Sequence, residues 1–356
     1  MRNIFIGGGT ASGKSTIIYL FDGHPEFLVN AIHFQIIEAF QNLINNYNEI
    51  KDRKINDKNF CFFLKYKEKK YYITEQDLEN ILLDIGIKTL EKYSNNKTYP
   101  NHTSALEKDF LKFNFDFQNF MKNLKKDLEN NKNSALSFKT FIEKFYYNFF
   151  SNWLDKKFIL SNEKSIVSKL TTNISGVEFA LNNIPNSKII YVDRKSIGIM
   201  KSRVLNFIRI RNLDIKDFYR YFLIFSKGDF FKKINYQKKK IRLLKKKFPD
   251  QIFLTSLEAL VDDKEKEMKK VANFLNIKFE EILTKITYLS KEIKGNHLDQ
   301  INDDRHQISE KSEFFFNIMD SNWNYSNKAS KLFYIKYFKE FLLSLYLRIK
   351  FLFIKI

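Results

Sequence analysis

The N-terminal residues Met1–Phe21 read MRNIFIGGGTASGKSTIIYLF, and they determine what kind of fold the 356-residue chain can adopt. Gly8, Gly13, Lys14 and Ser15 satisfy the pattern G-x-x-x-x-G-K-[ST] of a phosphate-binding loop. Glycines let such a loop turn tightly and bring its N–H groups against an anion. The first turn of the following helix adds unpaired N–H donors and the positive end of its dipole. The pattern therefore predicts an anion site built from Gly9, Thr10, Ala11, Ser12, Gly13, Lys14, Ser15 and Thr16.

The segments after the loop alternate between helical and strand patterns. Lys14–Asp22 has helical spacing, Phe27–Val29 is a short apolar run, and Phe34–Tyr47 is helical again. Much later, Lys188–Val192 is a continuous apolar run of the kind found in buried parallel strands, and a helical segment follows it. This order predicts an α/β fold of the P-loop nucleotide-binding type, with a parallel β-sheet flanked by helices.

Two regions depart from this alternation. Residues 51–164 carry many Lys and Asn, and they show one hairpin pattern, Lys65–Thr74, among three helical patterns: Gln76–Tyr93, Ser104–Glu129 and Ser137–Phe158. They predict a large helical insertion that covers the substrate side of the sheet. We therefore expect a single α/β domain over residues 1–300 and a C-terminal helical extension over residues 301–356.

The formal net charge of +20 comes mainly from 51 lysines. Compositional drift explains such an excess as well as an acidic substrate or an anionic membrane surface does. The lysines are dispersed and no known nucleic-acid-binding motif occurs, so we expect no specific nucleic-acid partner. Arginine is more informative because its planar fork matches phosphate, and five of the ten arginines lie between Arg194 and Arg220.

Other features concern the cellular compartment. The single cysteine, Cys61, excludes an intramolecular disulfide and is typical of a reducing compartment. The first apolar strand begins almost at Met1, so we expect no signal peptide and a cytoplasmic protein. The tail Leu332–Ile356 is hydrophobic and basic, but its longest uncharged run, Phe341–Leu347, is too short to span a membrane. It either packs on the domain or attaches the protein peripherally to the inner face of the membrane.

Two classes of enzyme fit the loop. The loop resembles that of uridine-kinase-like enzymes, and a kinase would use Asp193, after the apolar run Ile189–Val192, to hold Mg²⁺. The other class is the P-loop sulfotransferase, which binds 3′-phosphoadenosine 5′-phosphosulfate (PAPS) with a related loop and needs no metal.

Three segments favour the sulfotransferases. Lys188–Arg203 resembles the family's 3′-phosphate-binding segment, in which an Arg ends a strand and a Ser follows on the next helix; here these are Arg194 and Ser202, at the family's spacing. Leu20–Glu26, LFDGHPE, resembles the sequence after the family's first helix. Thr255–Ile277 is similar to a family segment in which a strand end is followed by a helix that finishes with Phe-Leu, here Phe274 and Leu275.

The order and spacing of the loop and these segments match the family over roughly residues 1–48 and 165–300. The likeness is greatest to tyrosyl-protein sulfotransferases and to bacterial polysaccharide or lipopolysaccharide-cluster sulfotransferases. It implies PAPS as the donor and no metal site. Two residues depart from the family pattern: Ala11 stands at a basic position, and Asp193 places an acid beside a phosphate site, where it is repulsive.

The resemblance also implies roles for individual residues. Lys14 would stabilise the 5′-phosphate leaving group, and Lys169 would neutralise the sulfuryl oxygens, unless it is one solvated lysine among many. His33 is the expected general base because Ala31 and Ile32 occupy the positions of the family's acidic pair. Further donor contacts are expected from Ser290, Lys294 and Gly295.

Of the expected reaction, the acceptor is the component that the sequence determines least. We expect a glycan, a lipid-linked glycan or a small hydroxylated molecule, and a peptide tyrosine stays open. Contacts with the acceptor are expected from residues 51–164, for which the resemblance implies nothing.

Overall fold

The computed structural model describes residues 2–30, 34–46, 60–66, 69–96, 114–130, 135–154, 164–170, 174–211, 221, 230–288, 291–292 and 342. At its centre lies a five-stranded parallel sheet in the order β2-β6-β1-β7-β8. The strands are β1 (Asn3–Gly8), β2 (Phe27–Val29), β6 (Ser165–Lys169), β7 (Lys188–Asp193) and β8 (Ile252–Ser256). This confirms the predicted α/β fold with a parallel sheet.

Strand β1 owes its central place to its apolar sequence, because all six of its residues are buried between two layers of helices. Its register with β6 and β7 then determines which residues of those strands lie next to the loop. Ile6 pairs with Lys169 of β6, and Gly8 pairs with Val192 of β7. The carboxyl ends of three strands therefore meet where the glycine-rich loop begins.

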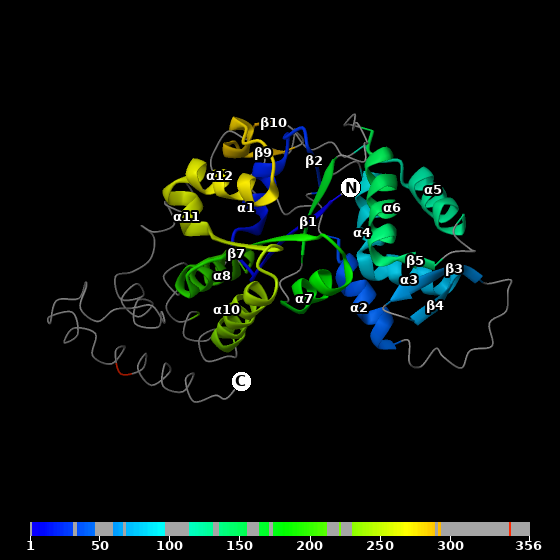
Figure 1. Cartoon of the computed structure of the whole chain (residues 1–356), viewed down its shortest axis with the longest axis horizontal. Helices are drawn as coiled ribbons and strands as arrows, with labels where there is room; N and C mark the ends of the chain where they lie inside the picture. Colours follow the sequence, from blue (N-terminus) through cyan, green and yellow to red (C-terminus); the bar gives the residue numbers. More distant parts are fainter. Residues whose placement is uncertain are drawn as a thin grey trace.

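Helices cover both faces of the sheet (Figure 1). On one face, α1 packs on β1 and β6, and α12 packs on β8. On the other face, α7 contacts β1 and β7, and α10 contacts β8 and α7. The covering helices are α1 (Lys14–Phe21), α7 (Ile174–Asn183), α8 (Ser196–Ile210), α10 (Phe230–Lys247), α11 (Leu257–Asp262) and α12 (Lys264–Leu275). A short 3₁₀ helix, η5 (Glu281–Thr284), and a hairpin of β9 (Thr287–Tyr288) and β10 (Lys291–Glu292) follow.

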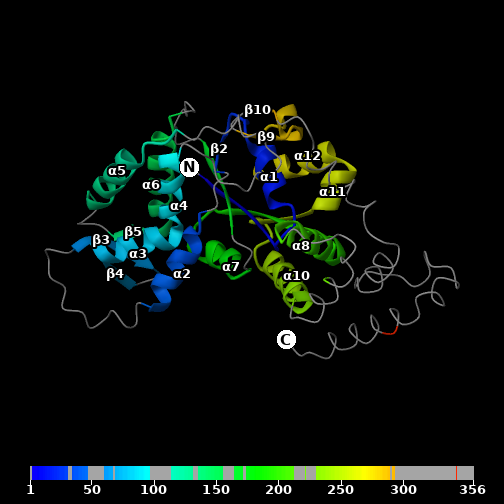
Figure 2. The same cartoon turned by 180° about the vertical axis from the view of Figure 1, so that it is seen from behind.

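The insertion lies to one side of the central sheet in both views (Figures 1 and 2). It is not purely helical, because it contains a three-stranded sheet in the order β4-β3-β5. Its strands are β3 (Phe60–Tyr66), β4 (Lys69–Thr74) and β5 (Ala135–Ser137). Its helices are α3 (Glu75–Ile85), α4 (Ile87–Asn96), α5 (Phe117–Glu129) and α6 (Phe138–Ser151), and α2 (Ile36–Asn46) packs against α3.

Local sequence explains where the predicted elements of the insertion were wrong. Gly86 adopts φ 102°, so the single helix expected over Gln76–Tyr93 is two helices. Helix α5 begins at Phe117 because the side chain of Asp116 accepts a hydrogen bond from the Asn119 N–H at 3.0 Å. The hairpin pattern of Lys65–Thr74 includes the end of β3 and all of β4, which pair antiparallel.

Aromatic side chains join the insertion to the central domain. Phe40 of α2 meets Phe138 and Phe141 of α6 edge to face, with ring centroids 4.6 and 4.8 Å apart. Phe34 meets Phe145 and Phe149 in the same way, at 5.2 Å in each case. Such pairs contribute about 0.5–1.5 kcal/mol each beyond the area that they bury, so α6 is held firmly beside the carboxyl end of the sheet.

The expected C-terminal extension, including the basic tail, lies outside the described residues apart from Leu342. Within the part that the structure describes, no helix combines the length and the apolar character needed to cross a membrane. Cys61 is buried in the small sheet.

Candidate active site

The loop between β1 and α1 is shaped by backbone conformations that favour glycine. Gly8 has φ 146° and Gly13 has φ 97°, while Ala11 adopts the left-handed region at φ 57°. A Cβ atom on Gly8 would lie 2.5 Å from the Val192 carbonyl oxygen, and one on Gly13 would lie 2.7 Å from Leu257 Cδ1. The glycines therefore allow the loop to lie directly against β7 and α11, with α1 beginning immediately after it.

Lys14 is the first residue of α1, and only 5% of it is exposed. Its Nζ donates hydrogen bonds to the carbonyl oxygens of Gly8 and Gly9, the latter at 3.0 Å. The pKa of Lys14 is lowered to about 7, mainly by burial and also by the positive charge of Lys169, while the carboxylate of Glu38 opposes both effects. The loop thus contains a cation that an entering anion would stabilise.

The second cation of the site comes from the end of β6. Lys169 Nζ donates a hydrogen bond to Ser15 Oγ at 3.0 Å, which places it at the start of α1. Burial lowers the pKa of Lys169 as well. Lys169 is thus partly buried beside Lys14, and its role towards the sulfuryl oxygens stays a prediction.

Arg194 follows β7 and reaches the same loop. Its Nη1 donates a hydrogen bond to the carbonyl oxygen of Ala11 at 3.0 Å. Its side chain lies across Gly198 of α8, where a Cβ atom would approach Arg194 Nε to 2.7 Å. Ser202 lies one helical turn after Gly198, on the same face of α8. Arg194 therefore reaches the loop, and the pairing of Arg194 with Ser202 at a 3′-phosphate stays a prediction.

The negative charge of Asp193 is compensated by a lysine of the neighbouring helix α10. Its carboxylate lies 3.3 Å from Lys238 Nζ of α10 and accepts a hydrogen bond from the Arg194 N–H at 2.8 Å. The same Lys238 ammonium donates to the Arg194 carbonyl oxygen at 2.8 Å. An acid beside a phosphate site is thus compensated by a lysine that braces the backbone of Arg194.

A polar cluster at the end of β2 could not be recognised from the sequence alone. Asn30 Nδ2 donates a hydrogen bond to Tyr146 Oη at 3.4 Å, and Tyr146 is also bonded to Ser168. The pKa of Tyr146 is raised to about 12, mainly by burial; the hydrogen bonds to Ser168 and Asn30 oppose this rise, and the charge of Glu38 adds to it. The cluster adjoins Lys169 and links α6 of the insertion to the central sheet.

Glu38 is the residue of this region that the sequence reading missed. It acts electrostatically on both Lys14 and Tyr146, and its Oε1 lies 3.2 Å from where a Cβ atom on Gly176 would be. A signal was present, since a glutamate interrupts the apolar run of α2, IIEAF, whose other members are buried. Glu38 thus brings a carboxylate to the edge of the cationic site.

The site also contains two serine hydroxyls whose hydrogen-bonding capacity the described residues leave unused. The hydroxyls of Ser12, in the loop, and Ser196, at the start of α8, are buried without a hydrogen-bond partner among the described residues. Unsatisfied polar atoms flanking a cationic loop fit a ligand rich in anionic oxygens. The remaining predicted site residues lie outside the described part of the chain, and their roles stay predictions: His33, Ser290, Lys294 and Gly295.

Comparison with known proteins identifies a family. A family model described as the sulfotransferase family matches residues 3–281. No curated protein matches the chain. Similar solved structures include a sulfotransferase domain from the curacin biosynthetic pathway, which is 17% identical with a TM-score of 0.45 over 87% of this chain and 92% of that one. The sulfotransferase domain of the Synechococcus PCC 7002 olefin synthase is 12% identical with a TM-score of 0.42 over 100% and 96% of the two chains. Sulfotransferase STF9 from Mycobacterium avium is 11% identical with a TM-score of 0.36 over 87% and 77%.

Proposed function

The chain belongs to the sulfotransferase family, and on that premise we propose that it transfers a sulfuryl group from PAPS to a hydroxyl of a glycan, a lipid-linked glycan or a small hydroxylated molecule. The protein is a sulfotransferase enzyme, so the kinase alternative is set aside. The pairing of Asp193 with Lys238 also gives this carboxylate a role other than holding Mg²⁺.

The observation that carries the choice of donor is the meeting of three cations at one loop. Lys14, Lys169 and Arg194 come from three different elements, and each makes a hydrogen bond to the loop or to the start of α1. PAPS carries phosphate groups on both its 5′ and its 3′ side, so it needs two cationic points. Lys14 and Lys169 suit the 5′ side, and Arg194 with Ser202 suits the 3′ side.

The donor would supply the sulfuryl group, and the chain's part is to stabilise charge and to position groups. Lys14 is buried where the loop meets α1, so its ammonium would stabilise charge that develops on the leaving 5′-phosphate. Lys169, fixed by Ser15, would lie against the sulfuryl oxygens. Burial strengthens both interactions because less water screens them.

Two residues are candidates for the base that accepts the proton of the acceptor hydroxyl. His33 follows from the family resemblance. Glu38 follows from its position, because its carboxylate acts on Lys14 and on Tyr146 of the insertion. A carboxylate whose charge acts both on the donor loop and on the insertion is a candidate for general-base catalysis.

The donor assignment can be tested by thermal unfolding. We expect adenosine 3′,5′-bisphosphate, the product of PAPS, to raise the Tm without Mg²⁺, and to do so more than adenosine 5′-monophosphate or ATP with Mg²⁺. Arg194→Ala should weaken bisphosphate binding by about ten- to a hundredfold and leave monophosphate binding nearly unchanged. Arg211→Ala, at the exposed end of α8, is the matched control and should change neither.

Two outcomes would count against the assignment. A larger effect of ATP with Mg²⁺ would exclude PAPS as the donor. If Arg194→Ala kept the preference for the bisphosphate, the 3′-phosphate would bind elsewhere.

A further inference from the structure

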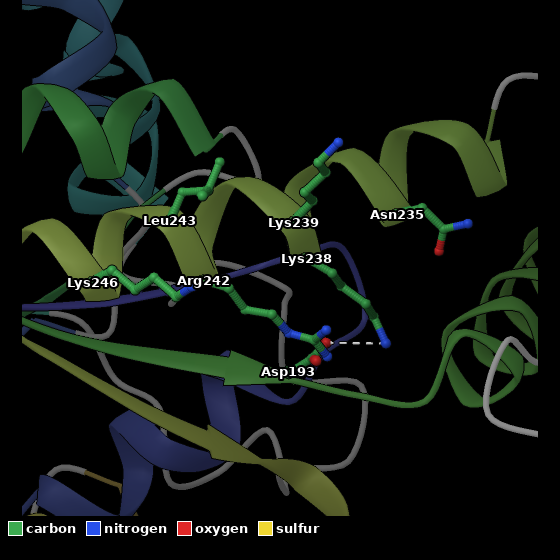
Figure 3. Close-up of a pocket in the computed structure, with 7 residues that line it drawn as sticks. All are labelled: Asp193, Asn235, Lys238, Lys239, Arg242, Leu243 and Lys246. Carbon is green, nitrogen blue, oxygen red and sulfur yellow. Dashed lines mark ion pairs between the residues drawn. The ribbon is translucent and has the colours of Figure 1, made fainter. Parts of the chain in front are cut away.

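Helix α10 places a lysine on the face that packs against the central domain. Ile234, Ile241 and Leu244 of this helix are buried. Lys238 lies four residues after Ile234 and three before Ile241, so it shares their face of the helix. The Lys238 side chain is 17% exposed, whereas that of Lys240 is 30% exposed. Figure 3 shows the Lys238 side chain extending from α10 to Asp193 at the end of β7.

One ion pair holds the backbone of Arg194 on both sides. Lys238 Nζ lies 3.3 Å from Asp193 Oδ1 and donates a hydrogen bond to the Arg194 carbonyl oxygen at 2.8 Å. The same Asp193 Oδ1 accepts a hydrogen bond from the Arg194 N–H at 2.8 Å. The Lys195 N–H donates to the Glu258 carboxylate of α11 at 3.0 Å, so the next peptide is also fixed. The backbone around Arg194 is therefore tied to α10 and α11 as well as to β7.

The guanidinium of Arg194 depends on this backbone position. Its Nη1 donates to the Ala11 carbonyl oxygen at 3.0 Å, and its Nε would lie 2.7 Å from a Cβ atom on Gly198. The side chain thus lies close against both the loop and α8. A guanidinium selects phosphate by aiming its planar fork, and a displacement of about 1 Å is enough to lose much of such an interaction. The groups that fix the backbone of Arg194 therefore also fix the direction of its fork.

The position of Asp193 is explained by this arrangement. By itself, its charge would oppose an anion bound at Arg194. Together with Lys238 it forms a neutral pair that supplies one acceptor and one donor to the Arg194 backbone. We propose that the Asp193–Lys238 pair positions Arg194 and so makes the chain selective for a nucleotide with a 3′-phosphate. This proposal rests on the proposed function and identifies residues that determine the selectivity of its donor site.

The test compares two nucleotides that differ only in the 3′-phosphate. Adenosine 3′,5′-bisphosphate and adenosine 5′-monophosphate are titrated into the full chain by calorimetry, and the ratio of their affinities is the selectivity. Lys238→Met should weaken bisphosphate binding by about five- to tenfold and monophosphate binding by less than about twofold. Lys238→Arg keeps the charge and the donors, so it should restore most of the ratio. Lys240→Met removes the same charge and another ion pair of α10, that with Glu178 at 3.0 Å, and should leave the ratio unchanged.

Two further variants separate positioning from charge. Asp193→Ala removes a negative charge beside the bound anion, so a purely electrostatic role predicts tighter bisphosphate binding. Positioning predicts the opposite, a loss of about three- to tenfold, because the Arg194 N–H and Lys238 both lose their partner. When Arg194 is already replaced by Ala, adding Lys238→Met should change the bisphosphate affinity by less than about twofold, since Lys238 acts through Arg194.

Three results would overturn the proposal. Tighter bisphosphate binding by Asp193→Ala would leave only a charge effect. A full additional loss from Lys238→Met in the Arg194→Ala protein would mean that the Lys238 ammonium contacts the phosphate itself. An equal loss in Lys240→Met would mean that only the general positive field of α10 attracts the ligand.

The proposal can be separated from a folding defect and from a failure of the proposed donor. An unchanged Tm shows that each variant folds, and if Lys238→Met lowered the Tm, the direction of the Asp193→Ala effect would decide the question by itself. Should the donor be wrong, the unmodified chain would already bind the bisphosphate no better than the monophosphate.

Discussion

At the scale of single residues, Lys14 has the least ordinary environment of the site. Its ammonium is buried, it bonds to two loop carbonyls, and it shares its surroundings with Lys169. Before a donor binds, these surroundings disfavour the protonated form of Lys14, which the reaction needs. Donor binding would restore that charge, because an anion near an ammonium raises its pKa.

This arrangement predicts the pH dependence of donor affinity. The pKa of Lys14 is lowered to about 7 from an ordinary 10.5, so the free protein loses the proton as the pH rises through about 7. The affinity for adenosine 3′,5′-bisphosphate should therefore fall between pH 7 and pH 9, by up to about tenfold per pH unit, and binding should take up a proton. Titration calorimetry in buffers of different ionisation enthalpy measures both.

Two variants serve as controls for this titration. Lys14→Met should bind weakly and flatten the profile. Lys169→Met removes a neighbouring positive charge, so it should raise the pKa of Lys14 and move the fall to higher pH. An affinity that stays constant from pH 7 to 9 in the unmodified chain would show that Lys14 does not govern donor binding.

At the scale of elements, the loop depends on the fit of one glycine against α11. Gly13 has φ 97°, and an added Cβ atom would lie 2.7 Å from Cδ1 of Leu257, which is buried. Gly86 has the similar φ of 102°, but nothing lies within 4 Å of its Cβ position. Comparing an alanine substitution at each glycine therefore separates the energetic cost of backbone strain from that of steric overlap.

The matched substitutions should differ in cost. Gly86→Ala should lower the free energy of unfolding by about 1–2 kcal/mol through backbone strain alone. Gly13→Ala should cost at least about 1 kcal/mol more, because α1 and α11 must separate, and it should also weaken bisphosphate binding. Urea unfolding of both variants measures the difference. Equal costs would mean that Leu257 yields freely and that the loop is not held by this contact.

At the scale of the whole molecule, three parts of the chain converge on Glu38. The residue belongs to α2, its carboxylate approaches Gly176 of α7, and its charge acts on Lys14 of the loop and on Tyr146 of the insertion. We expect Glu38→Gln to lower kcat by roughly 10²–10⁴ if it is the base. The substitution also lowers the pKa of Lys14, so bisphosphate binding should be unchanged only at about pH 5.5 and below, where Lys14 stays protonated in both proteins. Rates are measured with labelled donor and a cell extract in which transfer is found.

Tyr146→Phe is the control for this substitution. It keeps the carboxylate and removes the hydroxyl that bonds to Asn30 and Ser168, so it should lower stability by roughly 1–3 kcal/mol and reduce kcat much less. If Glu38→Gln left kcat unchanged, His33 would remain as the base.

Much of the central fold could be predicted from the sequence because the deciding signals are local. The glycine pattern before Lys14, the apolar runs of β2 and β7, and the helix that ends at Asn276 with φ 53° all depend on residues within a few positions of one another. The insertion was predicted less well. The strand pairing of β3 with β4 and β5 involves residues up to about seventy positions apart, which helical periodicity does not encode.

The sequence by itself determined the phosphate-binding loop, the parallel α/β fold and, through three further segments, the resemblance to sulfotransferases. Only the tertiary structure decided which charges meet at the loop. It placed Lys169, which the resemblance had already singled out, beside Lys14, paired Asp193 with Lys238, and brought Glu38 to Lys14. Periodicity along a chain states which face of an element is buried, but the neighbour of each side chain follows from the order β2-β6-β1-β7-β8, which joins segments far apart in sequence.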